Sequence, residues 1–276
     1  MKYKYKPPLK PKVKRIIAIP STLFLNDPQW LKTVKTGNIA RYAAIYRIED
    51  IYIYIDRGEK KNAYFLAYLL RYAETPQYLR KTLFPHHKWL KYAGLIPPLR
   101  TPHHPSPEDE FDVEYREGVV IGREGSKIMV DVGLKKPLIV EGNAPLGRRV
   151  AVKLGEKPHI VSKNNIPYYW GYNVHVAKSL SRAVSLSKAD LKIATSKYGV
   201  EITKIYNEFS KRANEASSIF LAFGSKDKGI LDMVGADICR KLFDAIINFV
   251  PNQGTVTIRT EEAINAVLAI INVIVR

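Results

Sequence analysis

Small and polar turn-forming residues follow three apolar segments in the C-terminal half of the sequence. They are Thr195, Ser196 and Gly199 after "LKIA", Gly224, Ser225 and Gly229 after "IFLAF", and Pro251, Asn252 and Gly254 after "IINFV". Each apolar segment is typical of a buried strand, and open α/β sheets bind ligands at the carboxyl ends of their strands. A single glycine in a turn needs no ligand to explain it. Three such turns at successive strand ends predict a pocket for an adenine-containing cofactor, lined by backbone N–H and C=O groups.

Other nucleotide and metal chemistries are disfavoured by the sequence. Gly224 and Gly229 have the spacing of a phosphate-binding P-loop, but Ile230 and Leu231 stand where that motif requires Lys and then Ser or Thr. The first strand-to-helix turn, "IPSTLF", lacks the dinucleotide fingerprint G-x-G-x-x-G, and no nucleophile motif G-x-S-x-G is present. Histidines occur as adjacent pairs or singly, and the only cysteine is Cys239. We therefore expect no metal site.

The chain carries a large excess of positive charge. Its 276 residues include 44 Lys and Arg against 26 Asp and Glu, a formal net charge of +18, which indicates an anionic polymer as partner, nucleic acid before membrane. Basic residues gather in residues 1–15, where Tyr3 and Tyr5 could stack on bases, and in residues 71–100. A disordered, solubilising tail explains the first ten residues equally well. The expected RNA contacts are Lys12, Lys14, Arg15, Arg80, Lys81 and Lys88.

No segment of the sequence marks it for export or for a membrane. A single cysteine excludes a disulfide framework and suits a reducing cytosol. The apolar segment after the basic N-terminus is too short for a signal peptide. The longest apolar tract, residues 263–275, is interrupted by Asn265 and Asn272 and is too short to span a bilayer. We therefore expect a cytoplasmic protein with no membrane partner.

The elements that would position these residues alternate between strands and helices at both ends of the chain. "RIIAIPS" and "IYIYID" are typical of buried strands, and "TGNIARYAAIYRIED" between them has helical spacing. "KNAYFLAYLLRYAETPQYLRKTLF" continues as helix with a break near Thr75 and Pro76. From Tyr169 strands and helices alternate again and end in the apolar helix "TEEAINAVLAIINVIV". This pattern predicts an α/β domain with a parallel sheet.

The middle of the chain has a different character. The segment "PPLRTPHHPSPEDEFD" indicates a boundary, and short alternating runs follow it near residues 118–122, 127–132, 135–140 and 149–154. Short strands separated by turn residues favour a small antiparallel barrel that resembles an OB-fold. We therefore predict a discontinuous α/β domain at residues 1–90 and 165–276, with an RNA-binding barrel inserted at residues 91–164.

Long segments, in order along the chain, resemble the SPOUT class of RNA methyltransferases. They include "IAIPSTL", "GNIARYAAIYRIEDIYIY", "YYWGYNVHVAKSLS", "AFGSKDKGI" and "PNQGTVTIRTEEAI", and the likeness runs from about residue 16 to residue 270. The resemblance is to the archaeal and eukaryotic branch, which carries a small β-barrel inserted in the catalytic domain. It implies a Rossmann-like parallel sheet with a C-terminal trefoil knot, which binds S-adenosylmethionine and releases S-adenosylhomocysteine. It also implies a homodimer formed through the knot region and the C-terminal helix.

The resemblance implies roles for individual residues as well. The catalytic candidates are Arg41, in "GNIAR", which matches a first-helix arginine near the target nucleotide, and Arg259, which would contact the substrate. A helix surface position or a phosphate contact would also explain Arg41. Glu261 and Glu262 follow Thr260 as acids in the first turn of a helix that Thr260 would cap. The cofactor would be bound by Thr195, Ser196, Phe223, Gly224, Ser225, Gly229, Phe249, Val250, Pro251, Asn252, Gly254, Thr257 and Ile258. A bulky residue at Gly254 would then abolish cofactor binding.

The expected function is methyl transfer from S-adenosylmethionine to a base nitrogen of ribosomal or other structured RNA, with an unpaired or flipped-out uridine as the favoured target. Two other functions fit the same residues. A non-catalytic RNA-binding or ribosome-assembly factor could keep the fold and lack the transfer activity. A purely structural dimerisation module would have no salt-dependent affinity for RNA.

Overall fold

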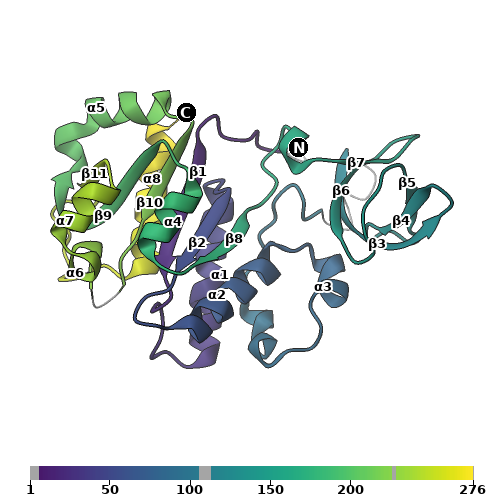
Figure 1. Ribbon diagram of the computed structural model, residues 1–276, viewed down its shortest axis with the longest axis horizontal. Coiled ribbons are helices and arrows are strands. Elements are labelled where there is room, and N and C mark those ends of the chain that lie inside the picture. The colour runs from purple at the N-terminus through teal and green to yellow at the C-terminus, as the bar shows by residue number, and fades with distance from the viewer. Residues whose placement is uncertain (1–5, 106–112, 226–227, 276) are drawn as a thin grey trace, which may run out of the picture. The chain divides into compact units, whose positions relative to one another are not determined.

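The computed structural model describes residues 6–105, 113–225 and 228–275 and divides into two compact units (Figure 1). The larger, which we call the α/β unit, comprises Pro11–Arg71, Trp89–Pro97 and Tyr172–Arg276. The smaller, which we call the small-sheet unit, comprises Met1–Lys10, Tyr72–Lys88 and Pro98–Gly171. The units therefore differ from the predicted division, because residues 72–88 cluster with the small sheet and residues 89–97 with the larger unit. Part of the predicted boundary segment, residues 106–112, lies outside the described residues.

A six-stranded sheet forms the centre of the α/β unit. Its strand order is β11-β9-β10-β1-β2-β8, and every pairing is parallel. The strands are β1 (Lys14–Pro20), β2 (Asp50–Tyr54), β8 (Asn173–Ala177), β9 (Leu191–Glu201), β10 (Ser218–Ala222) and β11 (Ala245–Asn248). All residues of β2 and β10 are buried, as is typical of continuous apolar runs in a parallel sheet. The predicted α/β architecture with a parallel sheet is confirmed.

Helices lie on both sides of this sheet. They are α1 (Gln29–Ile45), α2 (Lys60–Glu74), α4 (Leu180–Ser187), α5 (Ile202–Glu215), α6 (Ile230–Val234), α7 (Ala236–Leu242) and α8 (Thr260–Ile274), with the short 3-10 helices η1 (Lys88–Leu90) and η2 (Ala93–Leu95). On one face, Ala183 of α4, Ile230 of α6 and Cys239 of α7 belong to the same buried cluster as Ile16 and Phe220. In Figure 1, α4 lies in front of the sheet and α8 behind it, where α8 packs against α1.

The edge of the sheet beside β11 contains a long irregularity in β9. Ile246 of β11 pairs with Ala194, but the next residue, Ile247, pairs with Val200. Residues 195–199 are therefore extra residues that bulge out of the ladder. A Cβ on Gly199 would lie only 2.6 Å from the backbone oxygen of Ile246, so glycine is what lets the two strands approach here. Thr195 and Ser196 accordingly lie within a bulged strand, and the prediction of a turn after the strand is wrong in this detail.

The small-sheet unit contains five antiparallel strands in the order β5-β4-β3-β6-β7. They are β3 (Tyr115–Glu124), β4 (Lys127–Asp131), β5 (Leu138–Val140), β6 (Arg149–Lys153) and β7 (His159–Val161), with α3 (Gln77–Leu83) and the 3-10 helix η4 (Lys163–Asn165) in the same unit. A bridge between Glu141 and His159 joins the two ends of the strand order, so the sheet curls upon itself. Each of the four predicted runs contains or overlaps one of these strands. The core of the small-sheet unit consists of side chains that alternate along the strands, such as Val120, Ile128 and Val152.

A buried ionic cluster holds the small-sheet unit together. Arg149 Nη1 lies 2.6 Å from Glu74 Oε2, and Arg149 Nε lies 2.9 Å from Glu117 Oε2. Trp170 Nε1 donates a hydrogen bond of 2.6 Å to Glu117 Oε1, and Lys163 Nζ lies 3.2 Å from the same oxygen. Burial by itself would raise the pKa of Glu74, but the charges of Arg149 and Lys163 hold that pKa well below its usual value. The carboxylate is therefore ionised and fixes residues 72–88 to the small sheet.

Candidate functional site

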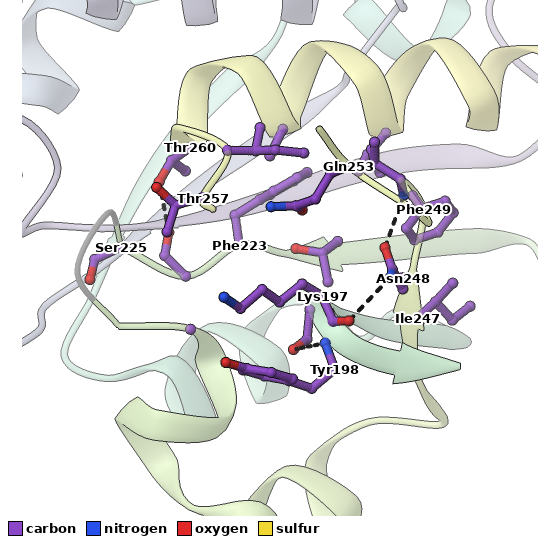
Figure 2. A pocket seen from close by; sticks show the side chains of 18 of the residues that line it. Lys197, Tyr198, Phe223, Ser225, Ile247, Asn248, Phe249, Gln253, Thr257 and Thr260 are labelled. Carbon is purple, nitrogen blue, oxygen red and sulfur yellow. Dashed lines mark hydrogen bonds between the residues drawn. The ribbon is translucent and has the colours of Figure 1, made fainter. Parts of the chain in front are cut away.

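A pocket of about 270 Å³ lies at the carboxyl ends of β9, β10 and β11 (Figure 2). We call it the first pocket. Its walls come from three stretches that are far apart in the sequence: residues 195–198, residues 223–232 and residues 247–267. Its described lining consists of Thr195, Ser196, Lys197, Tyr198, Phe223, Gly224, Ser225, Gly229, Asp232, Ile247, Asn248, Phe249, Val250, Gln253, Thr257, Ile258, Thr260, Ala263 and Val267. The sheet topology thus brings the β9 bulge and the segments after β10 and β11 to one place.

Three of the predicted cofactor residues do not line this pocket. They are Pro251, Asn252 and Gly254, which form the turn between Val250 and Thr257. A Cβ added to Gly254 would meet no atom within 4 Å. From the sequence we expect a bulky residue at position 254 to abolish cofactor binding, but the open space around Gly254 gives no steric reason for such a loss. Asn252, with φ of 56°, supplies the left-handed residue of this turn instead.

Several lining residues were not predicted from the sequence. Figure 2 shows Lys197 and Tyr198 on one side of the pocket, and Gln253, together with the predicted residue Thr257, on the side near the start of α8. Asn248 completes the wall at the end of β11. The sequence held a signal for Asn248 and Gln253, because Asn248 is a polar residue shortly before the predicted turn and Gln253 is a polar residue within it. The bulge that turns Lys197 and Tyr198 to the pocket left no such signal.

Hydrogen bonds tie the three walls to one another. The Thr195 hydroxyl donates to the Ala222 carbonyl at 2.8 Å, and the Thr260 hydroxyl donates to the Gly224 carbonyl at 3.0 Å. The side-chain amide of Asn248 donates to the Lys197 carbonyl at 3.1 Å, and its oxygen accepts from the Val250 N–H at 3.0 Å. These bonds link β9 to β10, β10 to α8 and β9 to β11. The pocket is therefore preorganised by the fold.

The residue that caps the start of α8 is not the predicted one. Arg259 is the N-cap residue, and its N–H donates to the Glu262 carboxylate at 2.9 Å. Thr260 is the first helical residue, so the prediction that it caps the helix is wrong. The capping role predicted for Glu262 is confirmed. Glu261 has a different role, since its Oε1 lies 3.6 Å from Lys35 Nζ on α1.

The residues of the first pocket fit an adenosine that carries no phosphates. Phe223, Ile247, Phe249 and Ile258 offer apolar and aromatic surface, while hydroxyl and backbone groups supply hydrogen bonds. Among the described lining residues, Lys197 is the one cation and Asp232 the one acid. Such a set lacks the cluster of cations and backbone donors that a nucleoside triphosphate requires.

A second pocket, of about 360 Å³, adjoins the first and shares Thr260 with it. Its described lining consists of Thr22, Leu23, Phe24, Leu25, Asn26, Asp27, Leu31, Lys35, Arg57, Arg259, Thr260 and Glu261. The sequence reasoning singled out Arg259 but no other part of this pocket as a substrate contact. Arg41 lies on α1, is partly buried and lines neither pocket.

The predicted RNA contacts differ in exposure. Arg15 is fully buried, and its guanidinium donates to the Val275 carbonyl, to Asn272 Oδ1 and to the Tyr46 carbonyl at 2.8, 2.8 and 2.9 Å. Burial lowers the pKa of Arg15 to about 10, so the group stays charged at neutral pH. The prediction that Arg15 contacts RNA is therefore wrong.

The other predicted RNA contacts remain at or near the surface. Lys12, Lys14, Lys81 and Lys88 are exposed, although Lys14 Nζ also lies 2.5 Å from Asp50 Oδ2. Arg80 is partly buried and donates to the Ala73 and Thr75 carbonyls. Tyr3 and Tyr5, the predicted stacking residues, lie outside the described residues.

No group of three or more His, Cys, Asp and Glu side chains that could hold a metal ion occurs among the described residues. None of the described helices has the length and apolar character needed to cross a bilayer.

Comparison with known proteins gives consistent matches. Residues 14–271 match the family described as "Putative RNA methyltransferase". Proteins named 28S rRNA (uridine-N(3))-methyltransferase are 32% identical in Drosophila melanogaster, over 92% of this chain, and 32% identical in Homo sapiens, over 92% of this chain. This chain spans 60% of the length of the Drosophila protein and 76% of the human one. An uncharacterized protein of Haloarcula marismortui is 33% identical over 86% of this chain and 90% of its own length.

Proposed function

The chain belongs to this family of RNA methyltransferases, and we propose that it transfers a methyl group from S-adenosylmethionine to a base nitrogen of ribosomal RNA. The observation that carries the proposal is the first pocket, in which three separate segments of the chain build a preorganised site suited to adenosine. The names of the Drosophila and human relatives favour N3 of uridine as the target atom.

The proposed mechanism rests on positioning. When bound, S-adenosylmethionine supplies a methyl group that is already activated on a sulfonium. Phe223, Phe249 and Ile258 would hold the adenosine, and Thr195 and Ser196 lie on the wall formed by the β9 bulge. The residues of the protein then have to align the target nitrogen with the methyl group and exclude water from the reacting atoms. In the transfer, N3 of the uridine would lose its proton to bulk solvent, and S-adenosylhomocysteine would leave as the second product.

Within the family, we assign the chain to the SPOUT class with a C-terminal trefoil knot and an OB-like inserted barrel. The path of the chain supports the knot: after β11 at the edge of the sheet, residues 249–259 lead back to α8, which packs on α1 and is bound by Arg15 of β1. The curled small sheet supports the barrel. We also place the protein in the cytoplasm as a homodimer joined through the knot region and α8.

RNA would be held by exposed basic side chains in this proposal. Lys12 and Lys14 precede or begin β1, Lys81 lies on α3 and Lys88 begins η1. Contacts of this kind go to phosphates, so they set the affinity and not the choice of nucleotide.

Two measurements test the proposed function. Calorimetric titration with S-adenosylmethionine should give saturable binding, and the purified protein with labelled S-adenosylmethionine should methylate unmodified ribosomal RNA. Mass spectrometry of the digested RNA should then contain N3-methyluridine. Absence of cofactor binding would end the proposal. Binding of both RNA and cofactor without transfer would favour the alternative of a non-catalytic ribosome-assembly factor.

A further inference from the structure

The second pocket is placed where a substrate of the proposed reaction would have to lie. Its wall includes Thr260, which also lines the first pocket, so the two cavities adjoin at the start of α8. Leu23, Phe24, Leu25 and Leu31 give it apolar surface. Its volume of about 360 Å³ lies in the range of small-molecule sites. It can therefore take a group of the size of a nucleotide beside a ligand in the first pocket.

Two bulky residues of this pocket have positive φ angles, a backbone conformation that residues other than glycine rarely adopt. Phe24 has φ of 59° and Arg57 has φ of 48°. A left-handed backbone at such residues is rare, and it persists only where the surrounding structure enforces it. Both residues line the same cavity, although they come from different loops. Strain of this kind is concentrated at ligand sites.

Hydrogen bonds hold the two loops in this conformation. The side-chain amide of Asn62, on α2, donates to the Ser21 carbonyl at 2.6 Å and to the Leu23 carbonyl at 2.8 Å. The Asp56 N–H donates to the Ser21 hydroxyl at 2.9 Å, and the Thr22 hydroxyl donates to the Asp56 carboxylate at 2.9 Å. The loop after β1 and the loop after β2 are thereby fixed to each other. The second pocket is a preformed cavity.

Charged side chains of both signs line the second pocket, and its two arginines are exposed at the rim. Lys35 Nζ lies 2.7 Å from Asp27 Oδ2 and 3.6 Å from Glu261 Oε1, so the charge of Lys35 is fully compensated by these two carboxylates. Arg57 and Arg259 are the other charged groups in the described lining, and both are exposed. Arg57 Nε lies 3.3 Å from Asp56 Oδ2, which leaves the rest of its guanidinium fork able to bind an anion.

We propose that the second pocket binds the nucleotide that is to be methylated, and that Arg57 and Arg259 contact its phosphates. The inference rests on the proposed function, which requires a base to reach the first pocket. A base that has left its stack would find apolar surface at Phe24 and Leu25. Arg57 would contact RNA and would take no part in binding the cofactor.

The test compares Arg57→Ala with Arg182→Ala. Arg182 is an exposed arginine on α4 that lines neither pocket and serves as the matched control. Because a charge-assisted hydrogen bond is worth about 1.5–3 kcal/mol, Arg57→Ala should raise the KM for ribosomal RNA by about tenfold or more. Arg57→Lys should recover part of this loss, and the affinity for S-adenosylmethionine should stay within about twofold of the wild type. The slope of the logarithm of RNA affinity against the logarithm of salt concentration should become shallower by about one, which is the contribution of one phosphate contact.

A second variant covers the case in which Arg57→Ala does not fold. Arg259→Ala removes the other rim arginine and leaves the backbone cap of α8 intact, so it should give the same rise in KM. The proposal is overturned if both rim variants bind and methylate ribosomal RNA as Arg182→Ala does, or if they lose S-adenosylmethionine along with RNA.

Filter binding of the same ribosomal RNA separates this inference from the proposed function. If the wild type does not bind S-adenosylmethionine, the methyltransferase proposal fails, whereas a weaker RNA affinity confined to the rim variants still supports an RNA site in the second pocket. If the wild type methylates RNA and the rim variants do so with an unchanged KM, the methyltransferase proposal stands and this inference fails.

Discussion

Gly199 and Gly254 show that two glycines near the same pocket can have different roles. A Cβ at position 199 would lie 2.6 Å from the Ile246 backbone oxygen, whereas a Cβ at position 254 would lie in open space. Only the first glycine is therefore required by close packing of the backbone. The bulge at residues 195–199 depends on it, and this bulge carries Thr195 and Ser196 to the first pocket.

We predict that Gly199→Ala weakens cofactor binding and that Gly254→Ala does not. The clash at position 199 involves backbone atoms, which have to shift, so we expect a loss of stability of about 1–3 kcal/mol. A displaced β9 bulge should reduce affinity for S-adenosylmethionine by about tenfold, equivalent to ~1.4 kcal/mol. Calorimetric titration and thermal unfolding of both variants measure these effects. Equal affinities in the two variants would contradict the role given to Gly199.

Glu74 leads to a prediction about stability and pH. In the folded protein the pKa of this buried carboxyl lies well below its unfolded value, because Arg149 and Lys163 outweigh the effect of burial. A depressed pKa contributes stability above the unfolded pKa, which is about 4.3 for Glu, and that contribution is lost as the pH falls. The wild type should therefore lose stability progressively as the pH drops below about 5.

Glu74→Gln isolates this contribution. Removing one charge of a buried pair leaves Arg149 partly uncompensated and should lower the free energy of unfolding by about 3 kcal/mol at pH 7. The difference between wild type and variant should shrink as the pH is lowered toward 3. Urea unfolding at several pH values measures it. A difference that stays constant with pH would show that the carboxylate charge is not the source of the stability.

At the scale of elements, α8 is fixed to the sheet by a residue from the other end of the chain. Arg15 of β1 donates to the Val275 carbonyl, just past the last turn of α8, and to Asn272 within it. Carbonyl groups at the end of a helix have no partner within the helix, so a buried guanidinium satisfies them. The first pocket includes residues from the start of α8, so Arg15 indirectly positions the site.

We predict that Arg15→Gln destabilises the protein by about 3 kcal/mol, because it removes a buried charged donor from carbonyl partners. Hydrogen exchange in residues 260–275 should become faster, since the end of α8 loses its anchor. Lys12→Gln is the control, as Lys12 is an exposed residue next to the same strand, and its stability should change by less than about 0.5 kcal/mol. Similar exchange in both variants would count against the anchor.

At the scale of the whole molecule, the proposed homodimer makes use of apolar surface that α8 leaves exposed. α8 buries Ile264, Leu268 and Ile271 within its own chain, but Val273 is 72% exposed. An exposed aliphatic residue on a helix that already packs inward is consistent with a second partner.

We predict that Val273→Asp shifts the protein from dimer to monomer, because a carboxylate would be buried without a partner in the interface. Leu186→Asp, on the exposed side of α4, is the control and should leave the oligomeric state unchanged. Sedimentation velocity of the wild type and both variants measures the outcome. A wild type that sediments as a monomer at all concentrations would rule out the dimer, and a dimeric Val273→Asp variant would place its interface elsewhere.

The secondary-structure elements and the chemical character of the site can be inferred from local patterns along the chain. Strand segments such as "IIAI" and "IYIYI" lack charged residues because a parallel sheet is covered on both faces, and turn residues such as Gly224 mark where strands end. These signals are local, so they could be read along the chain. They were sufficient to predict the parallel sheet, the short strands of the small-sheet unit and part of the lining of the first pocket, such as Thr195 and Gly224. The lining residues Phe223 and Phe249 were expected only from the family resemblance.

The tertiary structure alone decided which of these residues meet and which are withdrawn from solvent. Arg15 and Lys12 are both basic residues of the N-terminal segment, and nothing in the sequence distinguishes them. Arg15 can be buried because α8 returns to β1, where the end of α8 supplies a carbonyl partner for the guanidinium. The register shift between β9 and β11 brings Lys197 and Tyr198 to the first pocket. The loops after β1 and β2 line the second pocket together with Arg259. These arrangements depend on contacts between residues far apart in the chain, and such contacts leave no periodic trace in the sequence.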